Sequence, residues 1–538
     1  MTRREAWLSA GLVFAVALVV RALVASQIVF PKPEDTAYYV GVARNLLEGR
    51  GLVSDALWSY GTPPLIFPRP AFEVWLPLPS LLAAIPMLAF GISFGAAQVS
   101  SIVVGSIVAV LAWRLAADVA AERGLPTTRA RTLALGSGLT AAVYLPLVLH
   151  SALPDSTMPF AVLALGACLL MARLARDHGP VRLADPRVLG LGALIGLAAL
   201  TRNEAIWLGA TWALVGWRAG QLRLVAGVGA IAVAIFVPWM IRDWAVFGSP
   251  LPGQAATNAL SLTGLDIFAW NDPPTLARYL AAGPARLVQL RVEGIGHNLL
   301  SVLLLPGLPL SLIGLVALPW QARGAVIRPV LVLSAITFVA SGLLFPVSTT
   351  WGTFLHASGP VSVLIIVSAL LALDAAIARL ARRQGWTRPV AWLGPLLGIF
   401  GSILFSAALL PTFGTDSRAT AARYEELGRR MAAIGRPLDA SAGPVITDHP
   451  IWLAETSRIR VLALPDETPQ DVLDLARDPA FPGTRLVIVM DDHHGRWPTV
   501  LDGAEPGVEC FRELDLGPGP AGVPDPLSGA RAFEIVCP

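Results

Sequence analysis

Residues 7–30 read WLSAGLVFAVALVVRALVASQIVF, an apolar run with Arg21 as its one charged residue. The run is long enough to cross the hydrocarbon core of a bilayer, which takes about 20 residues of α-helix. Similar runs recur along the 538-residue chain, of which 55% is hydrophobic and 14% charged. These proportions exclude an ordinary soluble, disordered or fibrous protein. The sequence therefore predicts a multi-pass α-helical membrane protein.

The charges divide the chain into two parts. The whole chain has a net charge of +3, but residues 1–411 carry +11 and residues 412–538 carry −8. The second part is also much less apolar. We therefore expect a transmembrane module over 1–411 and an acidic soluble domain over 412–538, and no basic tract indicates nucleic-acid binding.

Arginine clusters predict the topology, because basic residues in short loops mark the cytoplasmic side. The clusters are Arg123/Arg129/Arg131, Arg173/Arg176/Arg182/Arg187, Arg218/Arg223, Arg323/Arg328 and Arg382/Arg383/Arg388. With these loops inside, eleven spans follow: 7–29, 95–117, 132–149, 157–175, 188–201, 204–217, 222–241, 297–319, 328–347, 359–380 and 388–411. The N-terminus is then cytoplasmic and the C-terminal domain lies outside.

The apolar stretch 71–91 is treated differently, because a full span there would place the later arginine clusters outside. Its three prolines, Pro77, Pro79 and Pro86, favour an interrupted helix. We predict a juxtamembrane or re-entrant helix within the first outer loop, 30–94. A second long outer loop covers 243–296, and long loops often carry function.

The C-terminal part alternates short apolar runs with helical patterns, which predicts an α/β domain. The runs are at 444–447, 460–464, 485–490, 511–516 and 532–536, and one helical pattern covers 468–477. If the last two runs pair as an antiparallel hairpin, Cys510 faces Cys537. An oxidising exterior permits a disulfide there, and two unpaired cysteines remain the alternative.

Polar residues from distant loops gather on the predicted outer side. They are Asp35, Asp155, Arg202 with Glu204, Arg242 with Asp243, and His356. Ionisable groups at membrane depth cost about 2.5–3.5 kcal/mol each on insertion scales, so they usually face a polar cavity and are functional candidates. The alternative for each residue is that it marks a helix end at the water interface.

Several segments in order resemble the C-type membrane glycosyltransferases, the superfamily of protein O-mannosyltransferases and the lipid A aminoarabinose transferase. The first is Pro33–Leu52, with an Asp, a Tyr and an "A-x-x-L-x-x-G-x-G" pattern. Further similar segments are Phe67–Pro70, His150–Asp155, Ala199–Glu204 ("L-T-R-x-E") and Pro238–Pro250 ("P-W-x-x-R-N…F-G-x-P"). Thr36 and Ala71 depart from the commoner pattern.

The resemblance implies an inverting transfer of a sugar from a polyprenyl phosphate to a lipid, glycan or protein acceptor on the outer face. Asp35 is the candidate base, and Asp155 would bind the acceptor or join Asp35 in holding a divalent metal ion. Candidate ligands of the donor phosphate are Arg69, Arg202 and Arg242. Glu204, Tyr38 and His356 are candidate supporting residues. A bacterial plasma membrane is expected, because the chain has no Asn-x-Ser/Thr sequon.

Other functions fit parts of the pattern. A lipid-linked sugar polymerase or oligosaccharide transferase would differ only in its acceptor. A transporter or flippase would place charges near the midplane and often shows inverted repeats, whereas here they gather at one surface. A non-catalytic scaffold would not need Asp35 near Asp155. The tetrapeptide Asp491–His494 could ligate a metal, but a solvated turn is the simpler interpretation.

Overall fold

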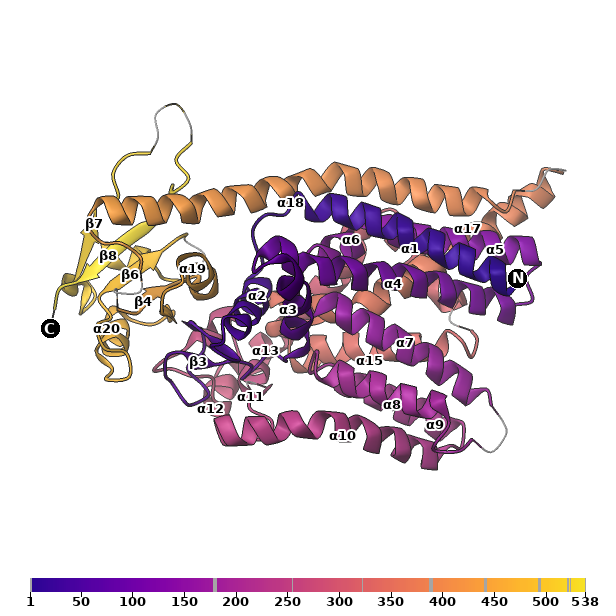
Figure 1. Ribbon diagram of the computed structural model, residues 1–538, viewed down its shortest axis with the longest axis horizontal. Helices are drawn as coiled ribbons and strands as arrows, with labels where there is room; N and C mark the ends of the chain where they lie inside the picture. The colour runs from indigo at the N-terminus through magenta and orange to yellow at the C-terminus, as the bar shows by residue number, and fades with distance from the viewer. Residues whose placement is uncertain are drawn as a thin grey trace.

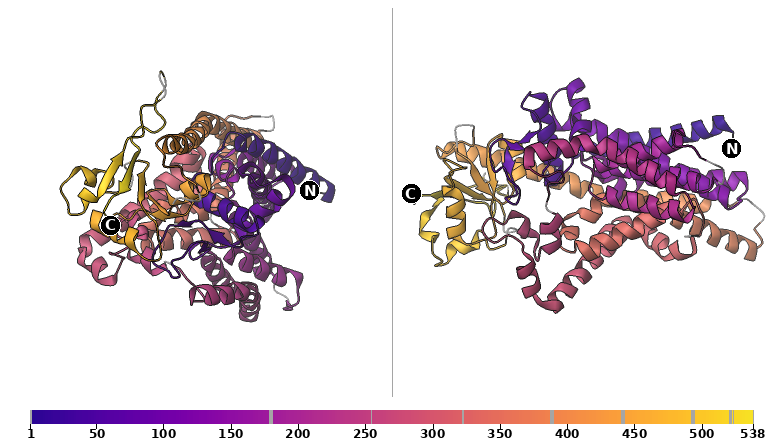
Figure 2. Two further views of the ribbon diagram at one scale, coloured as in Figure 1. Left: turned by 60° about the vertical axis from the view of Figure 1, so that its left-hand side comes forward. Right: turned by 90° about the horizontal axis from the view of Figure 1, so that it is seen from below.

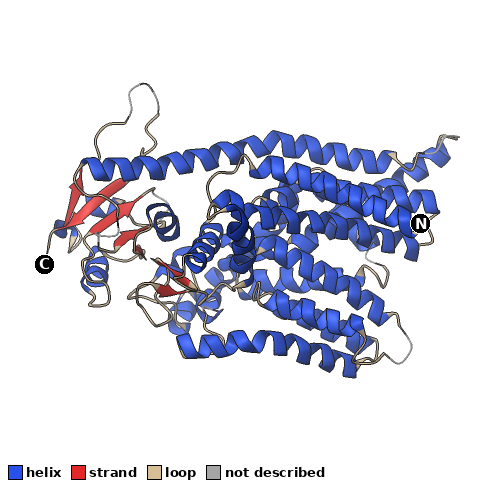
Figure 3. Cartoon of the chain, viewed as in Figure 1, coloured by secondary structure: helices blue, strands red, loops and turns tan. Residues whose placement is uncertain are grey.

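A computed structural model of the chain shows an elongated helical bundle with a small sheet domain at one end (Figures 1 and 3). It describes residues 2–177, 181–253, 255–321, 323–386, 390–439, 443–491, 495–519, 522 and 524–537. The N-terminus and the C-terminal domain lie at opposite ends of the molecule, as two further views also show (Figure 2). Arg388 and residues 492–494 lie outside the described part.

A helix occupies each of the eleven predicted spans. They are α1 (Arg3–Ala25), α4 (Phe94–Glu122), α5 (Thr127–Val143) with α6 (Leu145–Ser151), α7 (Thr157–Ala175), α8 (Pro186–Ala199), α9 (Ala205–Arg218), α10 (Leu222–Phe247), α14 (Leu310–Gln321), α15 (Arg328–Leu344), α17 (Gly359–Arg383) and α18 (Leu393–Ala433). Among the described residues, six single helices are long and apolar enough to cross a membrane, or up to eight spans if each bent pair counts as one. The helices α8, α9 and α15 are shorter, with 14, 14 and 17 residues.

Arg21 explains how one of the bent pairs is stabilised. Pro146 lacks the N–H that would donate to the carbonyl of Ala142, and α5 and α6 meet there at 55°. The buried Arg21 guanidinium donates instead to Ala142 O at 3.1 Å and to Ala141 O at 3.2 Å, and its Nε donates to Ser151 Oγ at 2.9 Å. The arginine in the first span is therefore a structural residue.

The stretch 71–91 contains α3 (Leu78–Phe90), with Pro86 inside it. Thirteen residues of α-helix extend about 20 Å, which is short of the roughly 30 Å hydrocarbon core. In Figure 1, α3 and α2 (Glu34–Leu47) lie across the direction of the long helices, at the end of the bundle nearest the sheet domain. This length agrees with the prediction of a juxtamembrane or re-entrant helix.

The two outer loops are structured. The first contains α2, α3 and three short strands, β1 (Val53–Ser54), β2 (Ala56–Leu57) and β3 (Arg69–Pro70), of which β1 pairs with β3. The second contains α11 (Ala255–Leu260), the 3-10 turn Gly264–Phe268, α12 (Leu276–Ala281) and all of α13 (Gly283–His297) except its last residue. A π-helical stretch, Asn298–Leu304, and the 3-10 turn Leu305–Gly307 connect α13 to α14, and the 3-10 turn Ser348–Trp351 and α16 (Thr353–Ala357) precede α17.

The helix α18 connects the bundle to the C-terminal domain. Its 41 residues extend about 60 Å, and Pro411, where we expected the module boundary, lies inside it. In Figure 1 this helix runs along the whole bundle and ends beside the sheet. The two parts are thus joined by continuous helix instead of a flexible linker.

The C-terminal domain has the predicted α/β composition. Its strands are β4 (Val445–Thr447), β5 (Val461–Ala463), β6 (Leu486–Val489), β7 (Phe511–Leu514) and β8 (Arg531–Ile535), with helices α19 (Pro450–Ser457) and α20 (Pro469–Arg477) and the 3-10 turns Thr499–Asp502 and Val508–Cys510. The sheet order is β2-β5-β4-β6-β8-β7. Its edge strand β2 comes from the first outer loop and pairs in parallel with β5, so this loop and the C-terminal part share one sheet and one hydrophobic core.

The predicted hairpin between the last two strands is confirmed. β7 and β8 are antiparallel, and a disulfide joins Cys510 to Cys537 at its end. Cys168 is free and buried in α7.

Candidate active site

The structure brings together two of the predicted acids through a histidine. Asp35 lies in the first turn of α2, Asp155 lies in the turn between α6 and α7, and His356 lies in α16. His356 Nε2 is 3.4 Å from Asp35 Oδ2, and its Nδ1 is 3.7 Å from Asp155 Oδ2. Three segments that are far apart in the sequence thus meet at one point, at the end of the bundle beside the sheet domain.

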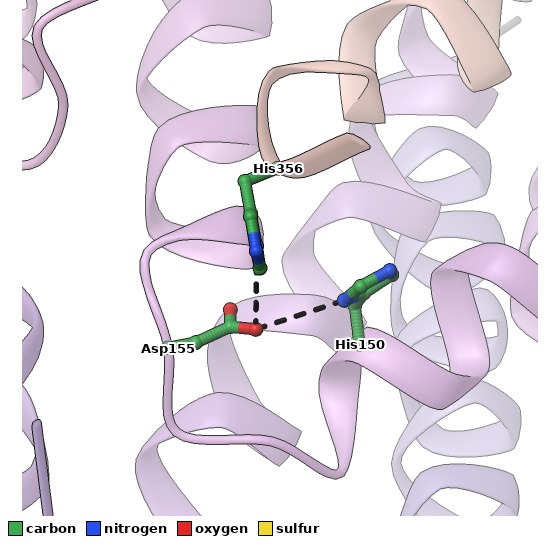
Figure 4. Close-up of side chains that lie close together, drawn as sticks. All are labelled: His150, Asp155 and His356. Carbon is green, nitrogen blue, oxygen red and sulfur yellow. Dashed lines mark ion pairs between the residues drawn. The ribbon is translucent and has the colours of Figure 1, made fainter. Parts of the chain in front are cut away.

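Asp155 is held from several sides. Figure 4 shows its carboxylate between the imidazoles of His150 and His356, with His150 Nδ1 3.6 Å from Asp155 Oδ2. The N–H of Thr157, in the first turn of α7, donates to Asp155 Oδ1 at 2.7 Å. The Thr157 hydroxyl also lies 2.7 Å from His356 Nδ1, so the start of α7 fixes both groups.

Arg202 and Glu204 form a second layer of the site. The two side chains are joined by two hydrogen bonds, Nε to Oε2 at 3.0 Å and Nη2 to Oε1 at 2.8 Å. Arg202 Nη1 donates to Ser156 Oγ at 2.7 Å, next to Asp155. A buried guanidinium held by a bidentate carboxylate has a fixed orientation, so Arg202 is a rigid positive group beside the acids.

Asp35 is the accessible acid of the pair. Its side chain is 26% exposed, whereas that of Asp155 is 0% exposed. Burial raises the pKa of Asp35 to about 6, against the opposing effect of Arg202. Burial lowers the pKa of His356 to about 3. At pH 7, Asp35 is therefore a carboxylate facing a neutral imidazole.

The two tyrosines after Asp35 have different roles. The hydroxyl of Tyr38 accepts a hydrogen bond of 2.7 Å from the N–H of Phe72, and its ring packs 4.4 Å from the ring of Trp75. Tyr38 therefore positions the outer loop. The hydroxyl of Tyr39 instead interacts with Ser156 and with the charges of Asp35 and Arg202, and sequence reasoning missed it.

Sequence reasoning also missed Trp75 and the role of His150. The Trp75 side chain acts on Asp35 and lowers the pKa of its carboxyl group, and His150 contacts Asp155 as described above. Two signals were available for His150: it belongs to the segment that carries Asp155, and it is five residues from that acid. No local pattern distinguishes Trp75 from the other 15 tryptophans.

Arg69 does not lie where a donor-phosphate ligand is expected. Its side chain is 0% exposed, and its guanidinium donates to the carbonyl oxygens of Thr62, at 2.6 Å, and Pro64. Glu73 provides a buried ion pair at 3.6 Å. These contacts assign Arg69 to the internal structure of the first loop, because the carbonyls and the carboxylate already surround its charge.

Arg242, near the end of α10, is more open. Its Nη1 lies 2.9 Å from Asp243 Oδ1, and its guanidinium lies over the rings of Trp239 and Phe247 at 4.8 and 5.1 Å. The side chain is 22% exposed, against 10% for Arg202. Stacking on aromatic rings leaves guanidinium N–H groups directed outward in its plane, which suits an anionic ligand.

Besides the predicted pair of Asp35 with Asp155, a second group could hold a metal ion. One ligand atom each from His150, Asp155 and His356 lies within 4.8 Å of the others. Asp155 Oδ2 and His150 Nδ1 are buried and have no hydrogen-bond partner among the described residues. Two imidazoles and a carboxylate suit a divalent transition-metal ion such as Zn²⁺, so these residues fit such an ion and Asp35 would lie beside it.

Comparisons with known proteins give the fold. No family model and no curated protein matches the sequence. Among solved structures, ArnT from Cupriavidus metallidurans bound to undecaprenyl phosphate aligns with a TM-score of 0.54 at 14% identity, over 98% of each chain. The archaeal oligosaccharyltransferase AglB from Archaeoglobus fulgidus, in complex with an inhibitory peptide and a dolichol-phosphate, aligns with a TM-score of 0.52 at 13% identity, over 88% of this chain and 69% of AglB.

The chain has the fold of ArnT. The likeness to ArnT extends over both the helical bundle and the C-terminal domain, since nearly the whole of each chain is aligned. The fold that the sequence motifs predicted is thereby confirmed, as a bundle with several helices long and apolar enough to cross a membrane and a C-terminal α/β domain.

Proposed function

We propose that this protein is an inverting glycosyltransferase that moves a sugar from a polyprenyl-phosphate donor to an acceptor on the outer face of the membrane. One observation carries the proposal: the accessible carboxylate of Asp35 lies in one cluster with His356, Asp155 and the fixed charge of Arg202. This cluster occurs in a fold shared with ArnT and AglB, whose structures contain undecaprenyl phosphate and dolichol-phosphate.

Asp35 would act as the general base. An acceptor hydroxyl is a weak nucleophile until a carboxylate takes its proton, and a positioned base typically contributes about 10²–10⁴ in rate. As the acceptor oxygen bonds to the anomeric carbon, the bond from that carbon to the phosphate oxygen breaks. The bonding pair leaves with the polyprenyl phosphate, and the proton remains on Asp35. A single displacement of this kind inverts the anomeric centre.

Arginines would stabilise the departing phosphate, because its negative charge grows in the transition state. We assign this role first to Arg242, which is the more exposed, and second to Arg202, which is held by Glu204 and Ser156. Arg69 is left out of this set and assigned to the loop. A metal ion held by His150, Asp155 and His356 would supply further positive charge at the phosphate when bound.

His356 and Asp155 would orient the base. The neutral imidazole of His356 can donate one N–H toward Asp35 while its other nitrogen faces Thr157 and Asp155. Tyr39, on α2, and Trp75 would also act on the Asp35 carboxylate. These residues would fix the direction of the Asp35 lone pair toward the acceptor hydroxyl.

The orientation in the membrane follows from two independent features. The arginine clusters favour the cytoplasm at the end of the bundle remote from the C-terminal domain. The disulfide between Cys510 and Cys537 is typical of an oxidising compartment. We therefore place the N-terminus in the cytoplasm and the C-terminal domain outside the plasma membrane of a bacterium. The acceptor would be a lipid, a glycan or a protein.

The proposal is tested with the purified protein in detergent or lipid nanodiscs. A panel of undecaprenyl-phosphate sugars and a matched panel of nucleotide sugars are supplied with membrane lipids as acceptors, and release of free undecaprenyl phosphate is measured. We expect turnover of at least one lipid-linked sugar. Turnover of nucleotide sugars alone, or vesicle transport of the intact lipid-linked sugar without cleavage, would overturn the proposal.

A further inference from the structure

The C-terminal sheet contains a position at which parallel α/β sheets often bind ligands. From β4 the chain passes through α19 to β5 on one side, and from β5 it passes through α20 to β6 on the other side of β4. The three strands are parallel. The strands β5 and β6, which follow β4 in the chain, therefore lie on opposite sides of β4. In parallel α/β sheets, ligands often bind at such a switch point, at the carboxyl ends of the strands.

Three side chains that can ligate a metal ion lie at the carboxyl ends of β4 and β6. Asp448 and His449 directly follow β4, and Asp491 follows β6. His449 Nε2 is 3.1 Å from Asp491 Oδ2, and one ligand atom from each of the three residues lies within 4.8 Å of the others. Of the tetrapeptide Asp491–His494 that the sequence singles out, Asp491 is the member within the described residues.

The backbone fixes Asp448 in place. Its carboxylate accepts hydrogen bonds from the N–H groups of Met490, at 2.9 Å, and Asp491, at 3.1 Å, and from the Thr447 hydroxyl at 3.0 Å. These bonds connect the end of β4 to the end of β6. A carboxylate oxygen can accept hydrogen bonds and still coordinate a cation, as ligating carboxylates usually do.

A buried hydroxyl is within electrostatic reach of the cluster. Tyr424, on α18, is 5% exposed, and its hydroxyl has no hydrogen-bond partner in the described part of the chain. The charges of Asp448, Glu34 and Asp491 all act on this hydroxyl. The nearby Arg423 also acts on it, but its guanidinium donates to the carbonyl oxygen of Met490. Three carboxylates and an unpaired hydroxyl around one imidazole form a cation-binding environment.

We propose that Asp448, His449 and Asp491 bind a divalent metal ion in the C-terminal domain. One imidazole with two carboxylates suits Zn²⁺ or Mn²⁺ better than Mg²⁺ or Ca²⁺, which prefer oxygen ligands alone. The site is separate from the His150, Asp155 and His356 group, and its residues come from a different part of the fold.

The site is connected to the segment that carries Asp35. Glu34 Oε1 accepts hydrogen bonds from the N–H groups of Ile451, at 3.1 Å, and Trp452, at 3.4 Å, at the start of α19. The ring of Trp452 stacks on His449 at 4.6 Å. A bound ion would thus hold the C-terminal domain against α2, one residue from Asp35.

Calorimetric titration of the full-length protein with Zn²⁺ or Mn²⁺ tests the proposal. All variants carry Asp155→Asn, which weakens the other candidate metal group. The test variants are His449→Gln and Asp491→Asn. The control is Asp474→Asn, which removes a carboxylate on α20 of the same domain that accepts a hydrogen bond from Gln470.

We expect one equivalent of metal to bind in the control and to bind at least tenfold more weakly in both test variants, since even outer partners of a metal site contribute about 10–100-fold in affinity. Equal affinity and stoichiometry in the control and the test variants would overturn the proposal.

A second measurement covers variants that fail to fold. Crystals of the native protein are soaked in Zn²⁺, and anomalous scattering locates the ions. We expect an ion bonded to His449 Nε2 and to oxygens of Asp448 and Asp491. Ions found only at other positions would overturn the proposal.

Discussion

The Nε2 atom of His356 lies 3.4 Å from the carboxylate of Asp35. The other nitrogen of the same ring faces Thr157 and Asp155, at 2.7 and 3.7 Å. His356 therefore connects the first outer loop to the start of α7, and the two acids that the sequence singles out share it as a neighbour.

Replacing His356 tests this connection. In His356→Gln we expect transfer to fall by about 10–100-fold in kcat, because Asp35 loses the group that orients it. Binding of undecaprenyl phosphate, measured with a metal chelator present, should be unchanged, since His356 is assigned to the phosphate only through the metal ion that it would hold. The control is His297→Gln, at the end of α13, which should transfer at the native rate. A lowered affinity with an unchanged kcat would contradict the assignment.

Arg242 and Arg202 are assigned to the phosphate in that order. Arg242→Lys should weaken binding of undecaprenyl phosphate by about tenfold, because an ammonium cannot reproduce the planar, stacked donor geometry of the guanidinium. The measurement is equilibrium binding of the lipid to protein in nanodiscs. As a control, Arg286→Lys changes an exposed arginine that pairs with Glu293, and it should bind as the native chain does. The assignment is wrong if both variants bind alike.

The disulfide joins the residue before β7 to a residue just after β8. Cys510 and Cys537 are 27 positions apart, and closing a loop of that size stabilises a domain by about 3 kcal/mol in the chain-entropy model. Cys510→Ser should therefore lower the unfolding temperature of the C-terminal domain, and a reductant should lower it in the native chain by a similar amount. Thermal unfolding with and without reductant measures both. An effect of the reductant on Cys510→Ser as large as on the native chain would argue against this role.

Arg21 is predicted to matter for stability and not for chemistry. Arg21→Leu leaves the carbonyls of Ala141 and Ala142 without a donor at the break between α5 and α6, and an unpaired buried acceptor costs about 1–3 kcal/mol. We expect a lower unfolding temperature with little change in kcat for the protein that remains folded. Loss of kcat without loss of stability would show that Arg21 belongs to the active site.

Much of the architecture is predictable from sequence because it depends on local signals. The apolar runs locate the helices of the bundle, and the short apolar segments at 444–536 locate the five strands β4 to β8. The edge strand β2 is different. Ala56 and Leu57 are only two residues, and they become a strand by pairing with Val461 and Leu462, about 400 positions away. No local pattern carries that information.

The candidate site was likewise predictable from the sequence only in part. The predicted topology places several helix ends together at one surface of the membrane. The residues Asp35, Asp155, Arg202 and His356 could be predicted because they stand at these helix ends. The distinction between Tyr38 and Tyr39 required the helix itself, since adjacent residues point about 100° apart around α2. The burial of Arg69 was not predictable, because its motif gives no measure of burial. Its charge is taken up by carbonyls of its own loop, which only the folded chain reveals.

Asp35 is assigned as the base of the transfer reaction. The most direct measurement is the turnover of an undecaprenyl-phosphate sugar by Asp35→Asn, with lipid binding measured on the same preparation. The control is Asp416→Asn, which removes the exposed partner of Lys32 near the same loop. We predict that Asp35→Asn binds the lipid as the native chain does and transfers about 10²–10⁴ times more slowly, while the control is unaffected. Native turnover by a folded Asp35→Asn variant would contradict the account.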